Sequence, residues 1–416
     1  MSAARIAILT AGHLCHNPRV IKEAATLARA GYDVEILGAW FDPELKVRDQ
    51  AMLQGLRVRF TAVIDLTSTR LSERAVGLLQ RARSKAARVL FRWAGLPSRF
   101  LLGLAAGALR RTAQELDADL YIAHLEPALP VALVLLRSGK CVGVDMEDWY
   151  SEDLLPEARK RRPILFLRKL EREVLRHSAY ATCPSHAMSE ALAATYGCVP
   201  PKVIHNAFAW ADRQSIDGLL SDRKNRRIPS IHWYSQTIGN GRGLEDLLAA
   251  LPSLNREVEI HLRGSPIAGF DSWLAARVPE HWRHRVFVHG LVPNEQLLSR
   301  ISEHDIGFAG EMKYSKSRDL TITNKILHYL LAGLAVVASD TAGQREVAEQ
   351  APGAVFLYPS GDALMLAAQI NGLLDSLETL NHAKVAALHA AELKFCWERQ
   401  EQALLGHIQI ALGAVS

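Results

Sequence analysis

Short apolar runs alternate with amphipathic segments along most of the chain. The apolar run 5–10 is followed by apolar residues at helical spacing from Pro18 to Gly31, and then by a second apolar run at 33–40. Proline suits the first turn of a helix and glycine the position after its end. The opening pattern therefore predicts a strand, a loop, a helix and a second strand.

The same order recurs through the chain, which predicts parallel sheets covered by helices on both faces. The pattern pauses over 209–229, a charged segment with Ser and Gly that is closed by Pro229, and then resumes. We therefore expect an α/β protein with two Rossmann-like, doubly wound parallel-sheet domains that face each other across a cleft. The expected boundaries are 1–208 for the first domain, 209–229 for a linker, 230–388 for the second domain and 389–416 for a last helix that returns to the first.

Composition agrees with two soluble domains. The chain has 416 residues, of which 49% are hydrophobic, and this length exceeds that of one ordinary core. No apolar run reaches the roughly 18 residues of a membrane span, and the N-terminus lacks a small-residue cleavage site. Five scattered cysteines form no CxxC pair, so neither disulfides nor a structural zinc is expected. These features predict a cytoplasmic protein.

Ligands of doubly wound sheets bind outside the carboxyl ends of the strands, so the loops after the strands are the candidate sites. The loop after the first strand has a single glycine, Gly12, and no GxGxxG pattern, which disfavours a dinucleotide dehydrogenase. The chain has no GxxxxGK[ST] phosphate loop either.

Several segments, in this order, resemble the GT-B-fold retaining glycosyltransferases of the family-four (group 1) type. In the first half, "NPRVIKEAATLARAGYDVEIL" is similar to the family's first helix and second strand, and "VDMEDWYSEDLLP" to its D-x-H-E-x-Y segment. In the second half, "GRGLEDLLAAL" and "TNKILHYLLAGLAVVASD" resemble its donor-binding domain. The resemblance implies that the first domain binds the acceptor and the second binds a nucleotide-sugar donor.

Sugar transfer from such a donor leaves a diphosphate, whose growing charge must be met by a metal ion or by cationic side chains and helix N-termini. The sequence has no DxD motif, so we expect a metal-independent enzyme without a cofactor, in which the nucleotide sugar is a co-substrate of unspecified base. By the resemblance, Arg242 and Lys325 bind the diphosphate, and Gly241 and Gly243 allow close backbone approach. Solvated roles for Arg242 and Lys325 remain open.

Family members typically carry two glutamates around this segment, where the present chain has Leu320 and His328. A histidine cannot hold two hydroxyls as a carboxylate can. Either donor recognition is rebuilt around His328, with Thr321 and Thr323 near the phosphates, or the donor function has lapsed. Asn324, next to Lys325, is a further donor-binding candidate. Packing alone is a third role for His328. Glu346, in a segment similar to the family's G-x-x-E loop, is a candidate for the ribose or sugar hydroxyls, or an ordinary surface glutamate.

The first domain offers two catalytic candidates. By the resemblance, His124 faces the acceptor and the reacting sugar, and Glu147 stands where relatives often have His. A carboxylate there can orient or deprotonate an acceptor hydroxyl. Capping of a strand or a helix would explain either residue equally well. Gly12 and His13 are expected to approach the donor, and no protein nucleophile is expected, because the leaving diphosphate helps to take the acceptor proton in this family.

The net charge of +5 is spread unevenly, and an insertion at about 68–112 carries a large excess of basic residues. Its basic residues Arg70, Arg74, Arg81, Lys85, Arg88 and Arg92 fall on one helical stripe beside Leu71, Leu78, Ala82, Val89 and Trp93. That layout is typical of a helix lying on an anionic membrane. A solvated helix packed on its own domain, or an anionic soluble acceptor, would also explain it. Nucleic acid is disfavoured, since no aromatic platform accompanies the charge.

We therefore expect a retaining glycosyltransferase that moves a sugar to a glycan or lipid-linked acceptor in surface glycan or glycolipid assembly, peripheral on the inner face of the cell membrane. Two alternatives stay open. A catalytically lapsed nucleotide-binding subunit that supports a partner is favoured by the missing glutamates at Leu320 and His328. A nucleotide-sugar epimerase shares the fold.

Overall fold

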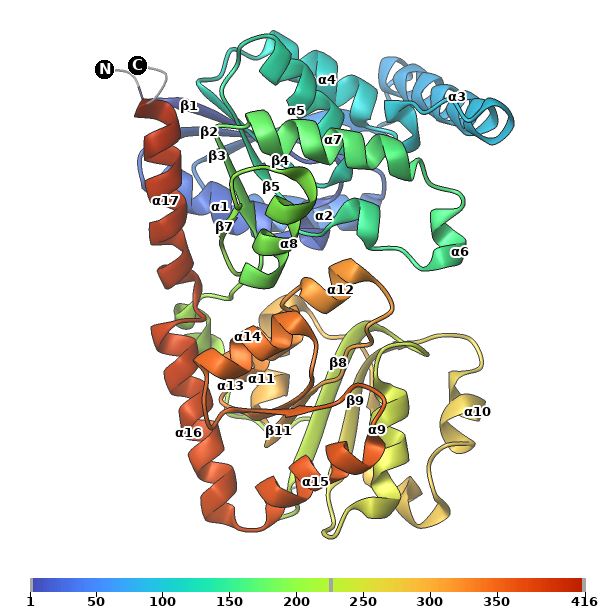
Figure 1. Cartoon of the computed structure of the whole chain (residues 1–416), viewed down its shortest axis with the longest axis vertical. Coiled ribbons are helices and arrows are strands. Elements are labelled where there is room, and N and C mark those ends of the chain that lie inside the picture. The colour runs from blue at the N-terminus through green and yellow to red at the C-terminus, as the bar shows by residue number, and fades with distance from the viewer. Residues whose placement is uncertain (1–2, 224–226, 414–416) are drawn as a thin grey trace. The chain divides into compact units, whose positions relative to one another are not determined.

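The computed structural model describes residues 3–223 and 227–413 (Figure 1). The chain divides into two compact units, one formed by Met1–Ile204 with Glu401–Ser416 and the other by His205–Gln400. Each unit is built on its own parallel sheet. The predicted fold class, two doubly wound Rossmann-like domains, is confirmed.

The sheet of the first unit has the order β3-β2-β1-β4-β5-β6-β7. Its strands are β1 (Arg5–Leu9), β2 (Asp33–Trp40), β3 (Val58–Asp65), β4 (Leu120–His124), β5 (Val142–Asp145), β6 (Tyr180–Cys183) and β7 (Lys202–Val203). All neighbours pair in parallel. The order reverses between β1 and β4, and ligands of open parallel sheets bind at the carboxyl edge beside such a reversal.

Helices join the strands of the first unit, and short polar side chains cap several of them. They are α1 (Pro18–Arg29), α2 (Pro43–Leu53), α3 (Leu71–Ala94), α4 (Ala106–Glu115), α5 (Leu129–Arg137), α6 (Pro156–Arg159), α7 (Ile164–His177) and α8 (His186–Tyr196). Asp42 caps α2 by accepting hydrogen bonds from the backbone N–H groups of Glu44 and Leu45. Pro18 opens α1 as the sequence pattern predicts.

The sheet of the second unit has the order β10-β9-β8-β11-β12-β13. Its strands are β8 (Ser230–Ile238), β9 (Glu259–Pro266), β10 (Val286–His289), β11 (Ile306–Ala309), β12 (Ala335–Ser339) and β13 (Val355–Tyr358). Its helices are α9 (Leu244–Ala250), α10 (Phe270–Ala275), α11 (Asn294–Ser302), α12 (Lys316–Leu320), α13 (Asn324–Ala332), α14 (Ala342–Gln350), α15 (Ala363–Leu374) and α16 (Leu377–Leu393).

The sheet of the second unit is buried on both faces. Along β12, Ala335 and Val337 pack into one apolar cluster, while Val336 and Ala338 pack into the other. Side chains of a strand alternate between the two faces, so a strand covered on both sides needs a continuous apolar run. The run that the sequence shows before Asp340 is therefore explained by its central place in the sheet.

Two segments bear on the expected domain boundaries: the expected linker and the last helix. The described part of 209–229 lies within the second unit, where Asp217 N–H donates to Ser299 Oγ (3.2 Å) and Asp222 N–H to Glu303 Oε2 (2.7 Å). The last helix of the chain, α17 (Trp397–Gly413), reaches the first unit from Glu401 onward. Among the described residues, no helix is long and apolar enough to cross a membrane.

Candidate functional site

In the second unit, the glycine-rich loop after β8 meets the loop after β11. Gly243, at φ 78°, precedes α9, and a Cβ on it would lie 2.6 Å from the carbonyl oxygen of Gly310. Only glycine fits that position. The neighbouring Arg242 is exposed, and its Nη1 donates to Ser235 Oγ at 3.2 Å. Gly241 N–H donates to Glu245 Oε1 at 2.7 Å, so the loop is held from both sides.

The N-terminus of α13 carries the next three candidates. Thr323 is its N-cap residue, yet the Thr323 hydroxyl is buried and makes no hydrogen bond. Asn324 is exposed, and its Oδ1 accepts from Asn206 Nδ2 at 3.0 Å. Lys325 Nζ lies 2.6 Å from Glu311 Oε1, and both side chains are largely buried. Unpaired backbone N–H groups at a helix N-terminus favour an anion, and a fixed lysine beside them adds to that preference.

Glu311 was not among the residues expected from the sequence. It follows β11, and its backbone N–H donates to Ser339 Oγ at the end of β12 (2.8 Å). Its carboxylate holds the Lys325 ammonium in one place. No sequence motif indicates this pair, because Glu311 lies in the loop after β11 and Lys325 in α13, and only the fold brings them into contact.

His328 is packed rather than open. It is 6% exposed, its ring stacks on Phe208 with centroids 4.0 Å apart, and its Nδ1 lies 3.0 Å from the hydroxyl of Tyr234. The aromatic surroundings explain why an imidazole is accommodated on an apolar helix face.

Glu346 lies in the second turn of α14, half-buried. The start of this helix is pressed against the loop before α13, because a Cβ on Gly343 would lie 2.4 Å from the carbonyl oxygen of Thr321. The contacts of Gly243, Glu311 and Gly343 thus connect the loops after β8, β11 and β12. The structure brings the donor candidates of the second unit together at the carboxyl edge of one sheet.

In the first unit, His124 ends β4 and is completely buried. Its Nδ1 lies 2.9 Å from Glu147 Oε1, and its Nε2 contacts Glu23 of α1. Burial opposes a charged imidazole, but Glu23, Glu147 and Asp145 outweigh it and raise the pKa of His124 to about 10. Both ring nitrogens of His124 are therefore engaged, and the contact with Glu147 fixes the position of that carboxylate.

The ion network beneath His124 continues to α1. Arg19, which is buried, makes a two-point contact with Asp145, and its Nη1 donates to the carbonyl oxygen of Ile204 at 2.9 Å. Thr182 also donates to Asp145, at 2.9 Å. Glu147, the most exposed carboxylate of the network, accepts from His124 and Asn17 Nδ2 through Oε1. Both of these contacts are made by Oε1, and neither engages Oε2.

His13 is also a structural residue in the loop after β1. Its Nε2 accepts from the backbone N–H groups of Phe41 (2.9 Å) and Asp42 (3.1 Å), so the proton sits on Nδ1 and is donated to Asp49 Oδ2 (2.7 Å). These bonds turn the imidazole inward. Gly12 is half-buried, and a Cβ on it would meet nothing within 4 Å. The space beside Gly12 is therefore open, whereas His13 is turned into the fold.

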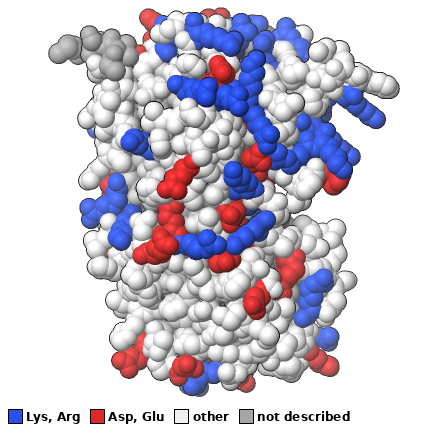
Figure 2. Space-filling view, in the orientation of Figure 1, with Lys and Arg blue, Asp and Glu red and all other residues white. Residues whose placement is uncertain are grey.

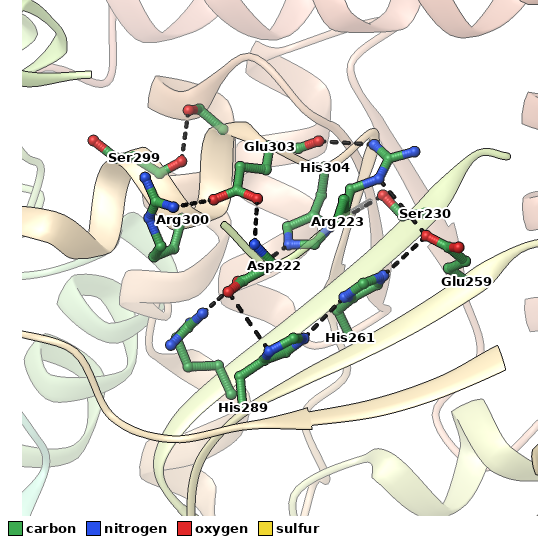
Figure 3. Close-up of polar contacts among 12 residues, drawn as sticks. Asp222, Arg223, Ser230, Glu259, His261, His289, Ser299, Arg300, Glu303 and His304 are labelled. Atoms are coloured by element: carbon green, nitrogen blue, oxygen red, sulfur yellow. Dashed lines mark hydrogen bonds and ion pairs between the residues drawn. The ribbon is translucent and has the colours of Figure 1, made fainter. Parts of the chain in front are cut away.

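A second polar cluster, which no sequence motif indicates, lies near the start of the second sheet (Figure 3). His261 Nδ1 lies 2.9 Å from His289 Nε2, and its Nε2 lies 3.2 Å from Glu259. Burial above all lowers the pKa of His261 to about 2 and that of His304 to about 4. His261 lies third in β9, near the amino end, so the cluster occupies the edge opposite the donor candidates.

Neither cluster fits a metal ion as it stands. Single ligand atoms of Asp222, His232 and His304 lie within 4.8 Å of one another. The two rings stack at an interplanar angle of 18°, so their in-plane lone pairs cannot converge on one ion. In the first unit, His124, Asp145 and Glu147 form a similar group, but both ring nitrogens of His124 are already in contact with Glu147 and Glu23.

Two family models match this chain in succession. Residues 19–208 match the model described as Glycosyltransferase Family 4, and residues 229–376 match the model described as Glycosyl transferases group 1. The first model covers the unit with the His124 network, and the second covers the unit with Arg242 and Lys325. A comparison with curated proteins finds no significant match.

Solved structures of the same overall fold include three with almost complete coverage. HepE from Anabaena, in complex with UDP-glucose, is 16% identical, with a TM-score of 0.69 over 97% of this chain and 99% of that one. A UDP-forming α,α-trehalose-phosphate synthase from Burkholderia xenovorans is 13% identical, with a TM-score of 0.67 over 98% and 99%. Sucrose-phosphate synthase from Thermosynechococcus elongatus is 15% identical, with a TM-score of 0.64 over 99% and 100%.

Proposed function

The chain belongs to the glycosyltransferases of family 4 and group 1, which have the GT-B fold, and on that premise we propose that it is a retaining, metal-independent enzyme of surface glycan or glycolipid assembly. It takes a hexosyl group from a nucleotide-sugar donor held by the second unit. It passes this group to a glycan or lipid-linked acceptor held by the first. The HepE complex with UDP-glucose supports a uridine diphosphate sugar as the donor.

The observation that carries the proposal is the convergence of cationic and hydrogen-bonding groups around the N-terminus of α13. The buried, unpartnered hydroxyl of Thr323 and the fixed ammonium of Lys325 lie beside the unpaired N–H groups of that helix. Arg242 adds an exposed guanidinium on the glycine loop. This set suits a diphosphate, whose negative charge grows as the bond to the sugar breaks.

Retention of configuration needs no protein nucleophile in this site. The bond between the anomeric carbon and the diphosphate oxygen breaks, and the acceptor hydroxyl oxygen bonds to the same carbon on the same face. The hydroxyl proton passes to the leaving diphosphate. Lys325 and Arg242 stabilise the departing charge, while Glu147 orients the acceptor hydroxyl by accepting a hydrogen bond. His124 is a positioning residue that holds Glu147.

Helix α3 supports attachment to an anionic membrane surface. Its buried residues are small or polar, namely Gly77, Gln80, Ser84 and Ala87, whereas its large apolar side chains face outward. Leu71, Leu78 and Trp93 are 81%, 67% and 82% exposed. Figure 2 shows basic side chains gathered on the surface around this helix. Exposed apolar groups flanked by arginines suit the boundary between lipid headgroups and acyl chains.

The first experiment measures binding of UDP, GDP, ADP, TDP and CMP by calorimetry, together with release of UDP from UDP-glucose. We expect Lys325→Ala to weaken binding of the preferred diphosphate at least tenfold, because a charge-assisted contact is lost. Lys384→Ala is the matched control. It also removes a lysine paired with a carboxylate, that of Asp305 at 2.9 Å, but at the opposite edge of the sheet.

The same experiment separates transfer from a lapsed nucleotide-binding role, which the aromatic packing of His328 favours. Diphosphate binding that depends on Lys325, without UDP release in the presence of any tested acceptor, would support the lapsed subunit. Equal binding by the Lys325→Ala and Lys384→Ala proteins would reject the donor site altogether.

A further inference from the structure

The first unit contains a pocket of about 490 Å³ that the glycosyl-transfer site does not use. Helix α3, the short 3-10 helix Arg99–Leu101 and helix α4 enclose it. Its walls are formed by Arg83, Arg99, Phe100, Gly107, Arg110, Arg111, Gln114 and Glu115. Pockets of this volume commonly hold small ligands.

Four arginines face this space without a carboxylate partner. None of them makes an ion pair with a carboxylate among residues 3–223 and 227–413, and the only carboxylate on the wall is that of the exposed Glu115. Arg110 Nε donates to Gln114 Oε1 at 3.1 Å. Arg99 and Arg110 are partly buried, whereas Arg83 and Arg111 are exposed. Elsewhere in this unit, the partly buried Arg162 is paired with Glu126.

Arg99 is the least favourably placed of the four arginines. Its Nε is buried and makes no hydrogen bond, and burial, followed by the charges of Arg110 and Arg83, lowers the pKa of its guanidinium. A buried donor without an acceptor, among like charges, destabilises the fold. No group of the described chain compensates for it, and an anionic ligand in the pocket would supply both an acceptor and the opposite charge.

The Phe100 ring packs against two of the four arginines. The Arg99 guanidinium lies 4.8 Å and that of Arg83 5.8 Å from the centroid of the Phe100 ring. A Cβ on Gly107 would lie 2.7 Å from this ring, so the glycine leaves the room that Phe100 occupies. The pocket is therefore shaped before any ligand arrives.

The pocket is separate from the transfer site of the same unit. Ala105, just before α4, packs with Ala11 in the apolar cluster that follows β1, whereas the other end of α4 leads toward the start of β4. Arg110 and Arg111 are the fifth and sixth of the ten residues of this helix, beyond the end that packs near Ala11 at the carboxyl edge, and Gln114 and Glu115 line the pocket still farther along α4.

We propose that this pocket is a second ligand site, which binds a phosphate or diphosphate group through Arg83, Arg99, Arg110 and Arg111. Guanidinium groups bind phosphate oxygens in pairs, with geometry that an ammonium does not offer. A lipid headgroup and a soluble phosphorylated molecule carry the same chemistry. The exposed apolar residues of α3, which also supplies Arg83, make the lipid headgroup an obvious source to test.

The test uses the full chain and inorganic pyrophosphate, measured by calorimetry. Because the donor site also attracts diphosphate, all proteins carry Lys325→Ala, so that the outcome does not depend on the proposed transfer function. We expect the double variant Arg99→Gln, Arg110→Gln to bind pyrophosphate at least tenfold more weakly. The control Arg81→Gln, Arg92→Gln removes the same charge from α3 outside the pocket and should change the affinity less than twofold.

Stability of the variants provides an independent readout. Removal of two mutually repelling guanidiniums should leave the unfolding temperature unchanged or raise it, so a folding defect does not mimic the expected loss of binding. Arg111→Gln, at an exposed position, provides a milder variant. Equal weakening by the pocket and control pairs would show diffuse attraction to α3 and would overturn the proposal, as would unchanged binding in the pocket variant.

Vesicles of phosphatidylcholine with and without phosphatidylglycerol distinguish the two sources of phosphate. If the pocket variant also loses binding to the anionic vesicles, and pyrophosphate displaces the parent protein from them, the ligand is a lipid headgroup. If vesicle binding is unchanged while pyrophosphate binding is lost, the ligand is a soluble phosphorylated molecule. Either result supports a phosphate site in this pocket.

Discussion

Gly243 lies at a point where the backbone of two loops meets, next to the exposed Arg242. Its φ of 78° lies in the left-handed region, and the carbonyl of Gly310 occupies the space that a side chain would need. Gly241 shares the left-handed conformation, at φ 73°, but a Cβ on it would meet nothing within 4 Å. A side chain at Gly241 would therefore meet backbone strain alone, whereas one at Gly243 would meet both strain and a steric clash.

We predict that Gly243→Ala lowers the free energy of unfolding by about 3 kcal/mol, the sum of left-handed strain and overpacking. Gly241→Ala should cost only about 1 kcal/mol, from strain alone. Urea denaturation of both proteins measures the difference. Equal losses would show that the contact with Gly310 relaxes freely, and the close approach of the two loops would then not constrain the donor site.

At the scale of single elements, α3 reverses the usual arrangement of an amphipathic helix. The sequence predicts an apolar face beside a basic stripe, and such a face normally packs on the domain. In the structure, Gly77 and Ala87 pack inward instead, while Leu78 and Trp93 are exposed. The periodicity of the helix was predictable. Which side faces the domain depended on its tertiary neighbours, because a Cβ on Gly77 would touch Leu66 at 2.5 Å.

We predict that Leu78→Ser and Trp93→Ser together change the free energy of unfolding by less than about 0.5 kcal/mol, as expected for exposed positions. The same pair should weaken binding to anionic vesicles at least fivefold, because apolar area that enters the interface is lost. Co-sedimentation measures this. Ala87→Asp, which buries a charge at a position 5% exposed, should destabilise the protein and serves as the contrast.

At the scale of the whole molecule, the two units respond to pH in opposite directions. The pKa of His124 is raised from its ordinary 6.5 to about 10. Its contribution to the free energy of unfolding is therefore complete below pH 6.5 and is lost as the pH rises to about 10. Burial lowers the pKa of His304 to about 4, so between pH 6.5 and 4 the unfolded chain binds a proton at this residue and the folded chain does not. Its stabilisation is therefore complete above pH 6.5 and is lost as the pH falls toward 4.

Hydrogen exchange of the intact chain at pH 5, 7 and 9, corrected for intrinsic rates, tests this opposition. Protection should fall first in β8 and β9 at pH 5, and first in β1 and β4 at pH 9. His304→Gln should flatten the acid response alone, and His124→Gln the alkaline response alone. Loss of protection in both sheets at the same extreme of pH would contradict the assignment.

The sequence by itself determined the fold class and the order of the elements, because the period of apolar residues and the placing of Pro18 and Gly31 act locally. Sheet topology also indicated the loops after the strands as the place of a site, and the resemblance to family-four glycosyltransferases singled out Arg242, Lys325 and His328 there. The fold needs only neighbours along the chain and the rules of sheet topology, whereas the choice of these residues needed the resemblance.

Only the tertiary structure decided what each candidate side chain touches. His124 and His13 turned out to be buried with both nitrogens engaged, and Lys325 proved to be paired with Glu311 from another loop. The arginine pocket between α3 and α4 was likewise hidden within a longer basic segment. Such contacts join residues far apart in sequence, and burial, charge and hydrogen bonding at a site depend on every element that packs there.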